Sequence, residues 1–234
     1  MTGITIPSPT GPGPAAAAPV GAAELHRWRG LAPGRARRLL DIAVSLSALA
    51  VAGVPMLALM VLIRLDSRGP ALFRQPRVGQ GERVFTLLKL RTMRLDQGGP
   101  EITARRDPRV TRIGRLLRKT SLDELPQMVN VLRGDMTLVG PRPETPALAV
   151  AYPPACRWVF AYRPGLTGAA QVRLRDTDVL GLSGGSVEAY LRLVVPARSR
   201  VEARYLALPS LPATFAVLVD TVRYLFGLEV RRRG

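Results

Sequence analysis

A run of 22 residues, Ile42–Ile63, is almost entirely apolar and carries no charged side chain. A helix of this length measures about 33 Å, enough to cross the hydrocarbon core of a bilayer. Pro55 lies inside the run, where it removes a helix hydrogen bond and bends the chain. Arginines flank both ends, and positive residues stay on the cytoplasmic side of a membrane. The pattern therefore predicts a re-entrant helix that bends at Pro55 and returns. The flanking arginines are Arg35, Arg37 and Arg38 before the run, and Arg64, Arg68, Arg74 and Arg77 after it.

Two other structures fit the same run. One is a plain single-pass helix that tolerates its proline, and the other is a buried helix of a soluble protein. The chain around it divides into three parts. Residues 1–34 are rich in Pro, Ala and Gly and predict a disordered tail. Residues 35–64 form the membrane helix, and residues 65–234 form the functional domain.

The domain after residue 64 shows both strand and helix patterns, and predicts a mixed α/β fold that is mostly helical. The helices near the C-terminus have apolar faces interrupted by arginines, which is typical of amphipathic helices at a membrane interface. Ordinary core-facing helices show the same pattern. The predicted strands are Ala71–Phe73, Val84–Leu90 and Met136–Val139, and the predicted helices are Val110–Arg118, Leu122–Leu132, Val187–Val195, Arg200–Leu206 and Ala213–Phe226.

The segment 118–130 carries the most chemical information. Ser121 followed by Glu124 is a capping-box pattern, which predicts a helix start. Asp123 would then lie in the first turn, where the helix dipole favours an ionised carboxylate. Such a carboxylate can attack phosphorus or bind a divalent cation. The plainer alternative is that Glu124 is only a cap and Asp123 a solvated acid.

The same segment predicts how the helix is buried. The apolar positions recur at helical spacing and predict the buried stripe, while three polar residues predict a separate face. The stripe consists of Leu122, Leu125, Met128, Val129 and Leu132, and the polar face consists of Asp123, Gln127 and Asn130.

Charge narrows the choice of partner. The chain has 34 basic and 17 acidic residues, a formal net charge of +17, and its only lysines are Lys89 and Lys119. Arginine binds phosphate through planar pairs of hydrogen bonds, so a phosphate-bearing partner is indicated, although a solvated surface is an alternative. A single cysteine, Cys156, and a single histidine, His26, give no support to a disulfide, a cysteine-based zinc cluster or a histidine-based triad.

Two loops present arginines beside prolines. Arg142 stands between Pro141 and Pro143, and Arg163 precedes Pro164–Gly165, a pair suited to the centre of a type II turn. Both loops can hold an arginine stiffly against a phosphate, or can simply be tight connections.

Taken in order, these motifs resemble the bacterial sugar transferase family, the monotopic polyprenyl-phosphate phosphoglycosyl transferases in their minimal form. The motifs that carry the resemblance are Lys89-Leu-Arg-Thr-Met93, Thr120-Ser-Leu-Asp-Glu-Leu-Pro-Gln127, Asn130, Gly134-Asp-Met136, Val139-Gly-Pro-Arg-Pro143 and Arg163-Pro-Gly-Leu-Thr-Gly168. The resemblance implies transfer of a sugar 1-phosphate from a nucleotide diphosphate sugar, most readily a UDP-sugar, to membrane polyprenyl phosphate. This step initiates lipid-linked glycan synthesis, for exopolysaccharide, O-antigen or glycoprotein.

The resemblance also implies roles for individual residues. Asp123 would be the nucleophile that forms a covalent phosphosugar intermediate, and Glu124 its partner in holding Mg²⁺. The substrate phosphates and nucleotide would be bound by Arg118, Arg142, Lys89, Arg91 and Arg163.

The implied location is the bacterial inner membrane, with the catalytic domain on its cytoplasmic face and in contact with membrane lipid. Nucleic acid is not an expected partner, because aromatic residues are only 5% of the chain and readers of single strands stack bases on aromatics. Two other functions stay open: a non-catalytic, membrane-anchored module that binds anionic lipid, and a nucleotide-sugar hydrolase. The sequence does not determine the oligomeric state, and it is compatible with an oligomer.

Overall fold

The computed structural model describes residues 34–95, 107–174, 186–207 and 210–228. The predicted tail, apart from its last residue, and the glycine-rich stretch 176–185 lie outside these ranges. In the described part the chain is mostly helical, with two small sheets, as the sequence predicts.

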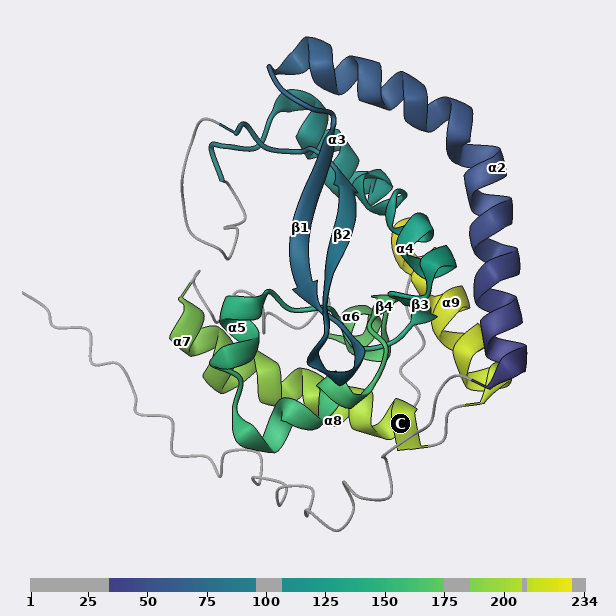
Figure 1. Cartoon of the computed structure of the whole chain (residues 1–234), viewed down its shortest axis with the longest axis vertical. Coiled ribbons are helices and arrows are strands. Elements are labelled where there is room, and N and C mark those ends of the chain that lie inside the picture. The colour runs from purple at the N-terminus through teal and green to yellow at the C-terminus, as the bar shows by residue number, and fades with distance from the viewer. Residues whose placement is uncertain (1–33, 96–106, 175–185, 208–209, 229–234) are drawn as a thin grey trace, which may run out of the picture.

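A long helix, α2 (Arg35–Asp66), runs along one side of the molecule and bends over the end where α3 lies (Figure 1). It is the one described helix long and apolar enough to cross a membrane. Its middle projects away from the domain, since Val51 is 80% and Val54 77% exposed. Helical structure continues through Pro55, so the proline does not divide the segment into two helices.

The N-terminal end of α2 is bound to the body of the protein by polar side chains. Arg38 donates to the carbonyls of Val131 and Leu132, both at 2.6 Å. Asp41, fully buried, accepts the Thr137 hydroxyl at 2.8 Å and the Leu138 amide at 3.0 Å. A charge buried this deeply needs such partners.

The C-terminal end of α2 is bound to the same body. Arg91, which is 3% exposed, donates to the carbonyls of Ser67 and Arg68 at 2.6 Å and of Ile63 at 3.3 Å. A cation here complements the negative end of the helix dipole. Asp66 accepts the backbone amide of Ile113 at 3.1 Å. Both ends of α2 are therefore attached to one folded unit.

An antiparallel hairpin of β1 (Leu72–Val78) and β2 (Val84–Leu90) runs through the middle of the molecule (Figure 1). The second strand has the predicted bounds, whereas the first extends beyond the predicted Ala71–Phe73. In the register Arg77 lies opposite Phe85, so Arg77 shares a face with the alternate residues Leu87 and Lys89.

The second sheet has two parallel strands, β3 (Thr137–Val139) and β4 (Gly165–Thr167). The type II turn predicted at Pro164–Gly165 is wrong, because Gly165 begins β4 and does not have the positive φ that such a turn requires. Glycine is needed at position 165 because the backbone of Gly140 lies so near that a Cβ would be 2.1 Å from the Gly140 nitrogen. The two strands can approach only without that side chain.

The segment that contains the acidic pair folds differently from the prediction. Helix α3 (Arg112–Thr120) ends at Ser121, whose left-handed φ of 57° breaks the helix. A single 3-10 turn, η2 (Leu122–Glu124), precedes α4 (Gln127–Arg133), and the Ser121 side chain makes no capping bond. The capping box is therefore wrong. Ser121 already serves as the C-cap of α3.

The burial of α4 is also the reverse of the prediction. The predicted stripe, Leu122, Leu125, Met128, Val129 and Leu132, is only half-buried, and the polar face, Asp123, Gln127 and Asn130, is buried. The physical reason is that this face packs against β2, where Asn130 bonds the strand backbone at Thr86 and Leu88.

The remaining helices follow β3 in the chain. The helices predicted near residues 187–195, 200–206 and 213–226 are present. They are accompanied by short helices that the sequence does not predict. Among the described residues the remaining helices are α5 (Pro146–Val150), η3 (Pro154–Ala161), α6 (Ala169–Arg173), α7 (Val187–Ala189), a π-helical turn η5 (Tyr190–Val194), α8 (Val195–Ala207) and α9 (Leu211–Leu225), with a further turn η1 (Gln80–Glu82) in the hairpin.

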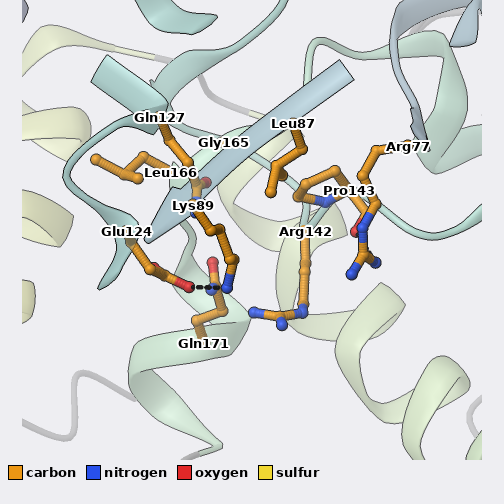
Figure 2. A pocket seen from close by; sticks show the side chains of 10 residues that line it. All are labelled: Arg77, Leu87, Lys89, Glu124, Gln127, Arg142, Pro143, Gly165, Leu166 and Gln171. Carbon is orange, nitrogen blue, oxygen red and sulfur yellow. Dashed lines mark hydrogen bonds and ion pairs between the residues drawn. The ribbon is translucent and has the colours of Figure 1, made fainter. Parts of the chain in front are cut away.

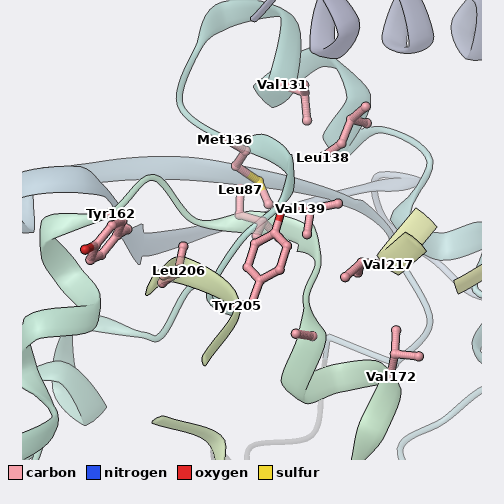
Figure 3. Packing of buried hydrophobic residues seen from close by; sticks show 11 residues of the cluster. Leu87, Val131, Met136, Leu138, Val139, Tyr162, Val172, Tyr205, Leu206 and Val217 are labelled. Carbon is pink, nitrogen blue, oxygen red and sulfur yellow. The ribbon is translucent and has the colours of Figure 1, made fainter. Parts of the chain in front are cut away.

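The largest hydrophobic cluster of the described residues joins β2, α4, β3, α6, α8 and α9 (Figure 3). Removing this surface from water is the main contribution to the stability of the fold. Its buried members are Leu87, Val131, Met136, Leu138, Val139, Tyr162, Ala169, Val172, Tyr205, Leu206 and Val217.

We expect Gly114→Ala to destabilise the protein, because a Cβ at this position would lie 2.0 Å from the Thr92 carbonyl oxygen. Overpacking of this kind costs about 1–3 kcal/mol. The control is Gly53→Ala in α2, where no atom lies within 4 Å. Alanine favours a helix over glycine by about 1 kcal/mol. Denaturant unfolding of the solubilised protein measures both variants, and equal effects would contradict the packing of α3.

Candidate active site

A pocket opens where the hairpin, the acidic segment and the two arginine loops meet (Figure 2). Three of the predicted site residues, Lys89, Glu124 and Arg142, line it together. The lining is Arg77, Leu87, Lys89, Glu124, Gln127, Arg142, Pro143, Gly165, Leu166 and Gln171.

Lys89 joins the pocket to the acidic pair. Its ammonium donates to Glu124 Oε1 at 2.9 Å and lies 3.9 Å from Asp123 Oδ2. Asp123 is 7% exposed and lies beside the pocket, outside its lining. The two carboxylates therefore face the same cation.

The environment shifts the pKa values of the two carboxyl groups in opposite directions. Burial raises the pKa of the Asp123 carboxyl above its ordinary value, against the opposing effect of Lys89. Burial acts in the same direction on Glu124, but Lys89 and Arg142 hold its pKa below the usual range. The predicted stabilisation of an ionised Asp123 by a helix dipole is wrong, since η2 is a single turn and desolvation dominates. Asp123 is the more basic of the pair.

Arg118 is a second cation that interacts with Asp123. It is half-buried, and its Nε donates to the Thr92 hydroxyl at 2.9 Å. Burial lowers the pKa of Arg118, and Asp123 is the leading group that raises it. A cation close to Asp123 is thus present at the predicted position.

Arg142 projects into the pocket from a loop whose backbone is held at three points (Figure 2). The Pro141 carbonyl accepts the Gly165 amide at 2.8 Å, and the Pro143 carbonyl accepts Arg77 at 3.1 Å. The Glu144 carbonyl accepts the Val78 amide at 2.8 Å. The loop is therefore a rigid support for the guanidinium.

Behind this loop lies a buried polar network. The Tyr190 hydroxyl donates to Glu144 Oε1 at 2.6 Å, and Arg198 donates to the same hydroxyl at 2.7 Å. Arg198 also lies 3.7 Å from Glu144. Burial would lower the pKa of Arg142, but Glu124 and Glu144 keep it above the ordinary value. The network supplies part of the negative charge that keeps Arg142 ionised.

Two of the predicted phosphate-binding residues lie elsewhere. Arg91 is occupied by the carbonyls at the end of α2, so its role in this structure is to hold that helix. Arg163 lies among charged groups near the N-terminal end of α2. Burial lowers the pKa of Arg163, and Arg38, Asp41 and Asp135 also affect it. Neither lines the pocket.

The sequence does not single out Arg77 and Gln171, which line the pocket. Arg77 can be found from the hairpin, because its pairing with Phe85 places it on the same face as Lys89. For Gln171 the sequence offers no comparable signal. Gln127 belongs to the predicted polar face of its helix, and it is the one member of that face that lines the pocket.

The chain matches known proteins over most of its length. A family model described as bacterial sugar transferase matches residues 33–227. The UDP-glucose:undecaprenyl-phosphate glucose-1-phosphate transferase of Caulobacter vibrioides is 49% identical over 156 residues, which are 64% of this chain and 55% of that protein. This chain therefore covers little more than half of that relative.

Two further relatives have related names. The undecaprenyl-phosphate glucose phosphotransferase of Komagataeibacter xylinus is 46% identical over 146 residues, 58% of this chain and 27% of its own length. The exopolysaccharide production protein PSS of Rhizobium leguminosarum bv. phaseoli is 43% identical over 146 residues, 58% of this chain and 73% of its own.

We expect Tyr190→Phe to lower the free energy of unfolding by about 1–3 kcal/mol, because it leaves buried Glu144 and Arg198 without the hydroxyl that joins them. Tyr152→Phe is the control, since the Tyr152 ring is equally buried and its hydroxyl makes no hydrogen bond within the described residues. Denaturant unfolding compares the two. Equal losses would show that the hydroxyl network contributes nothing.

Proposed function

Because the chain belongs to the bacterial sugar transferase family, we propose that it transfers a sugar 1-phosphate from a UDP-sugar to a membrane polyprenyl phosphate. The relatives' names point to undecaprenyl phosphate as acceptor and to exopolysaccharide as a product. The observation that carries the proposal is the acidic pair of buried Asp123 and half-buried Glu124, which faces Lys89 at a pocket lined by Arg77 and Arg142.

Asp123 is the proposed nucleophile. A carboxylate oxygen attacks the phosphorus that bears the sugar, the bond to the UMP oxygen breaks, and UMP leaves with the electron pair. An oxygen of polyprenyl phosphate then attacks the same phosphorus and releases the Asp123 carboxylate. The raised pKa of Asp123 supports this role, because a more basic carboxylate is a stronger nucleophile once ionised.

The cations around the pair have a separate task. A diphosphate and a carboxylate repel each other, and fixed positive charge must offset that repulsion as the bond forms. Arg142 and Arg77 line the pocket on which the diphosphate would lie, and Lys89 stands between the pocket and Asp123. We assign phosphate binding to these three residues and to Arg118.

The acidic pair fits Mg²⁺ in its donor chemistry. Its two carboxylates already face one cation position, which Lys89 takes. No cluster of three or more acidic, cysteine or histidine side chains occurs among the described residues. Mg²⁺ is commonly held by one or two carboxylates together with substrate phosphates. When bound, it would supply positive charge to the departing UMP oxygen, with Glu124 and Asp123 as its protein ligands.

We further propose that α2 enters the cytoplasmic leaflet of the inner membrane and returns to the same side. Both of its ends are bound to one folded domain, by Arg38 and Asp41 at one end and by Arg91 at the other. A helix that crossed the bilayer would separate these contacts. The exposed apolar middle of α2 would then face lipid, and the pocket would face the cytoplasm.

We expect Asp123→Asn to abolish transfer, because an amide cannot act as the nucleophile. Incubation of the wild type with radiolabelled UDP-sugar and no acceptor should label the chain at Asp123, and polyprenyl phosphate should release the label. Glu188→Gln, an exposed carboxylate on α7, is the control and should behave as wild type. Near-normal turnover by Asp123→Asn would refute the mechanism. Release of free sugar phosphate without acceptor would indicate a hydrolase instead.

The topology has its own test. In a variant with Cys156 replaced by Ala, single cysteines at Arg35 and Arg68 should both resist an impermeant thiol reagent in intact cells. Both should react after the cells are permeabilised, which controls for accessibility. Reaction of only one position in intact cells would show a helix that spans the membrane.

A further inference from the structure

A second buried carboxylate lies outside the acidic pair. Glu202 on α8 is 3% exposed and belongs to the same helix as the core residues Tyr205 and Leu206. Its Oε1 accepts the Ala170 amide at 3.0 Å. Its Oε2 is buried and has no hydrogen-bond partner among the described residues. An ionised carboxylate with one oxygen unpaired in this position is costly.

Gln171 directly follows the residue that Glu202 bonds. Its side chain lines the pocket and points toward the Lys89–Glu124 pair (Figure 2). Its Oε1 is also buried without a partner in the described part of the chain.

The two side chains converge at Gly168. A Cβ on Gly168 would lie 2.8 Å from Glu202 Oε1 and 3.4 Å from Gln171 Oε1. Glycine at this position leaves the space in which a carboxyl and an amide oxygen come near each other. Glu202 Oε1 already accepts the Ala170 amide, so the acceptors without a partner are Oε2 of the same carboxyl group and Gln171 Oε1. These two groups beside one glycine lack a donor.

A proton on Glu202 supplies that donor. Burial raises the pKa of Glu202 to about 7, against the opposing effects of the Ala170 amide, Arg198 on the same helix and Arg173 on α6. Tyr205, on the same helix, also interacts with Glu202. The acid form is therefore accessible near neutral pH.

We propose that Glu202 is a positioning residue of the pocket, whose neutral carboxyl group donates to the Gln171 carbonyl and so presents the Gln171 amide NH₂ to the bound substrate. This inference rests on the proposed function, because the substrate it names is the nucleotide sugar. The NH₂ group can donate to phosphate or sugar oxygens. Gln171 is thus a second kind of contact, neutral and directional, beside the cations of the pocket.

The protonation state of Glu202 determines how substrate binding by Gln171 changes with pH. Below about pH 7 Glu202 is neutral and holds Gln171. As pH rises through that value, the carboxylate forms and repels the amide oxygen, so Gln171 loses its orientation. Loss of one hydrogen bond to the substrate corresponds to an increase of about three- to tenfold in KM.

The test uses the full chain in lipid nanodiscs, with UMP release measured from pH 6 to pH 8. Wild-type KM for the UDP-sugar should rise about three- to tenfold across this range, with a smaller change in kcat. Glu202→Gln keeps a neutral donor and should hold KM low at both ends. Gln171→Ala should have a high KM that does not change with pH, and Glu188→Gln should follow the wild type. A wild-type pH dependence retained in Glu202→Gln would overturn the proposal.

A second measurement does not depend on activity. At pH 6 the infrared spectrum should contain a protonated carboxyl band that is absent in Glu202→Gln and present in Glu188→Gln. Glu202→Gln should also raise Tm relative to wild type more at pH 8 than at pH 6, because it removes a charge that is buried only at the higher pH. Absence of the band would mean that an ionised Glu202 accepts from a turned Gln171 amide, and would overturn the proposal even in an active enzyme. Presence of the band in a protein without transferase activity would refute the proposed function alone.

Discussion

The buried amide of Asn130 takes the place of a neighbouring strand along β2. Its Oδ1 accepts the Leu88 amide at 3.1 Å, and its Nδ2 donates to the Thr86 carbonyl at 2.8 Å. Without it, the Leu88 amide would lie in the interior unpaired, which is rare in folded proteins. Lys89 is the next residue of the strand, and the acidic pair immediately precedes the helix that carries Asn130. The Asn130 side chain therefore fixes α4 against the strand that carries the cation, directly beside the segment that carries the two acids.

The elements that the sequence predicts well are those whose signal is local. The uncharged run Ile42–Ile63 gives α2, and the short strand-like run Val84–Leu90 gives β2 with its observed ends. The first strand is underestimated because Gln75, Pro76 and Arg77 interrupt its apolar run, although pairing with β2 keeps them extended. The capping box fails for a related reason: whether Ser121 starts or ends a helix depends on α3 before it.

The site residues that the sequence predicts are those that lie in short motifs with several reactive or charged side chains. Asp123, Glu124 and Lys89 stand in distinctive motifs, and the fold brings them together. Arg91 shows the limit of this reasoning. It follows Lys89 by two residues, but its partners are carbonyls more than twenty positions earlier, at the end of α2. A motif indicates which residue types are present, and only the tertiary structure decides which carbonyl or phosphate each arginine meets.

The attachment of α2 at both ends has a consequence for the order of assembly. Its C-terminal end is held by Arg91, which is 28 residues beyond Ile63, so this end can be fixed as soon as the first hairpin forms. Its N-terminal end depends on Leu138, 97 residues beyond Asp41. Closing so long a loop carries a larger entropic cost and cannot occur until β3 has been synthesised. The two ends of α2 therefore become fixed at separate stages of folding, the C-terminal end before the N-terminal end.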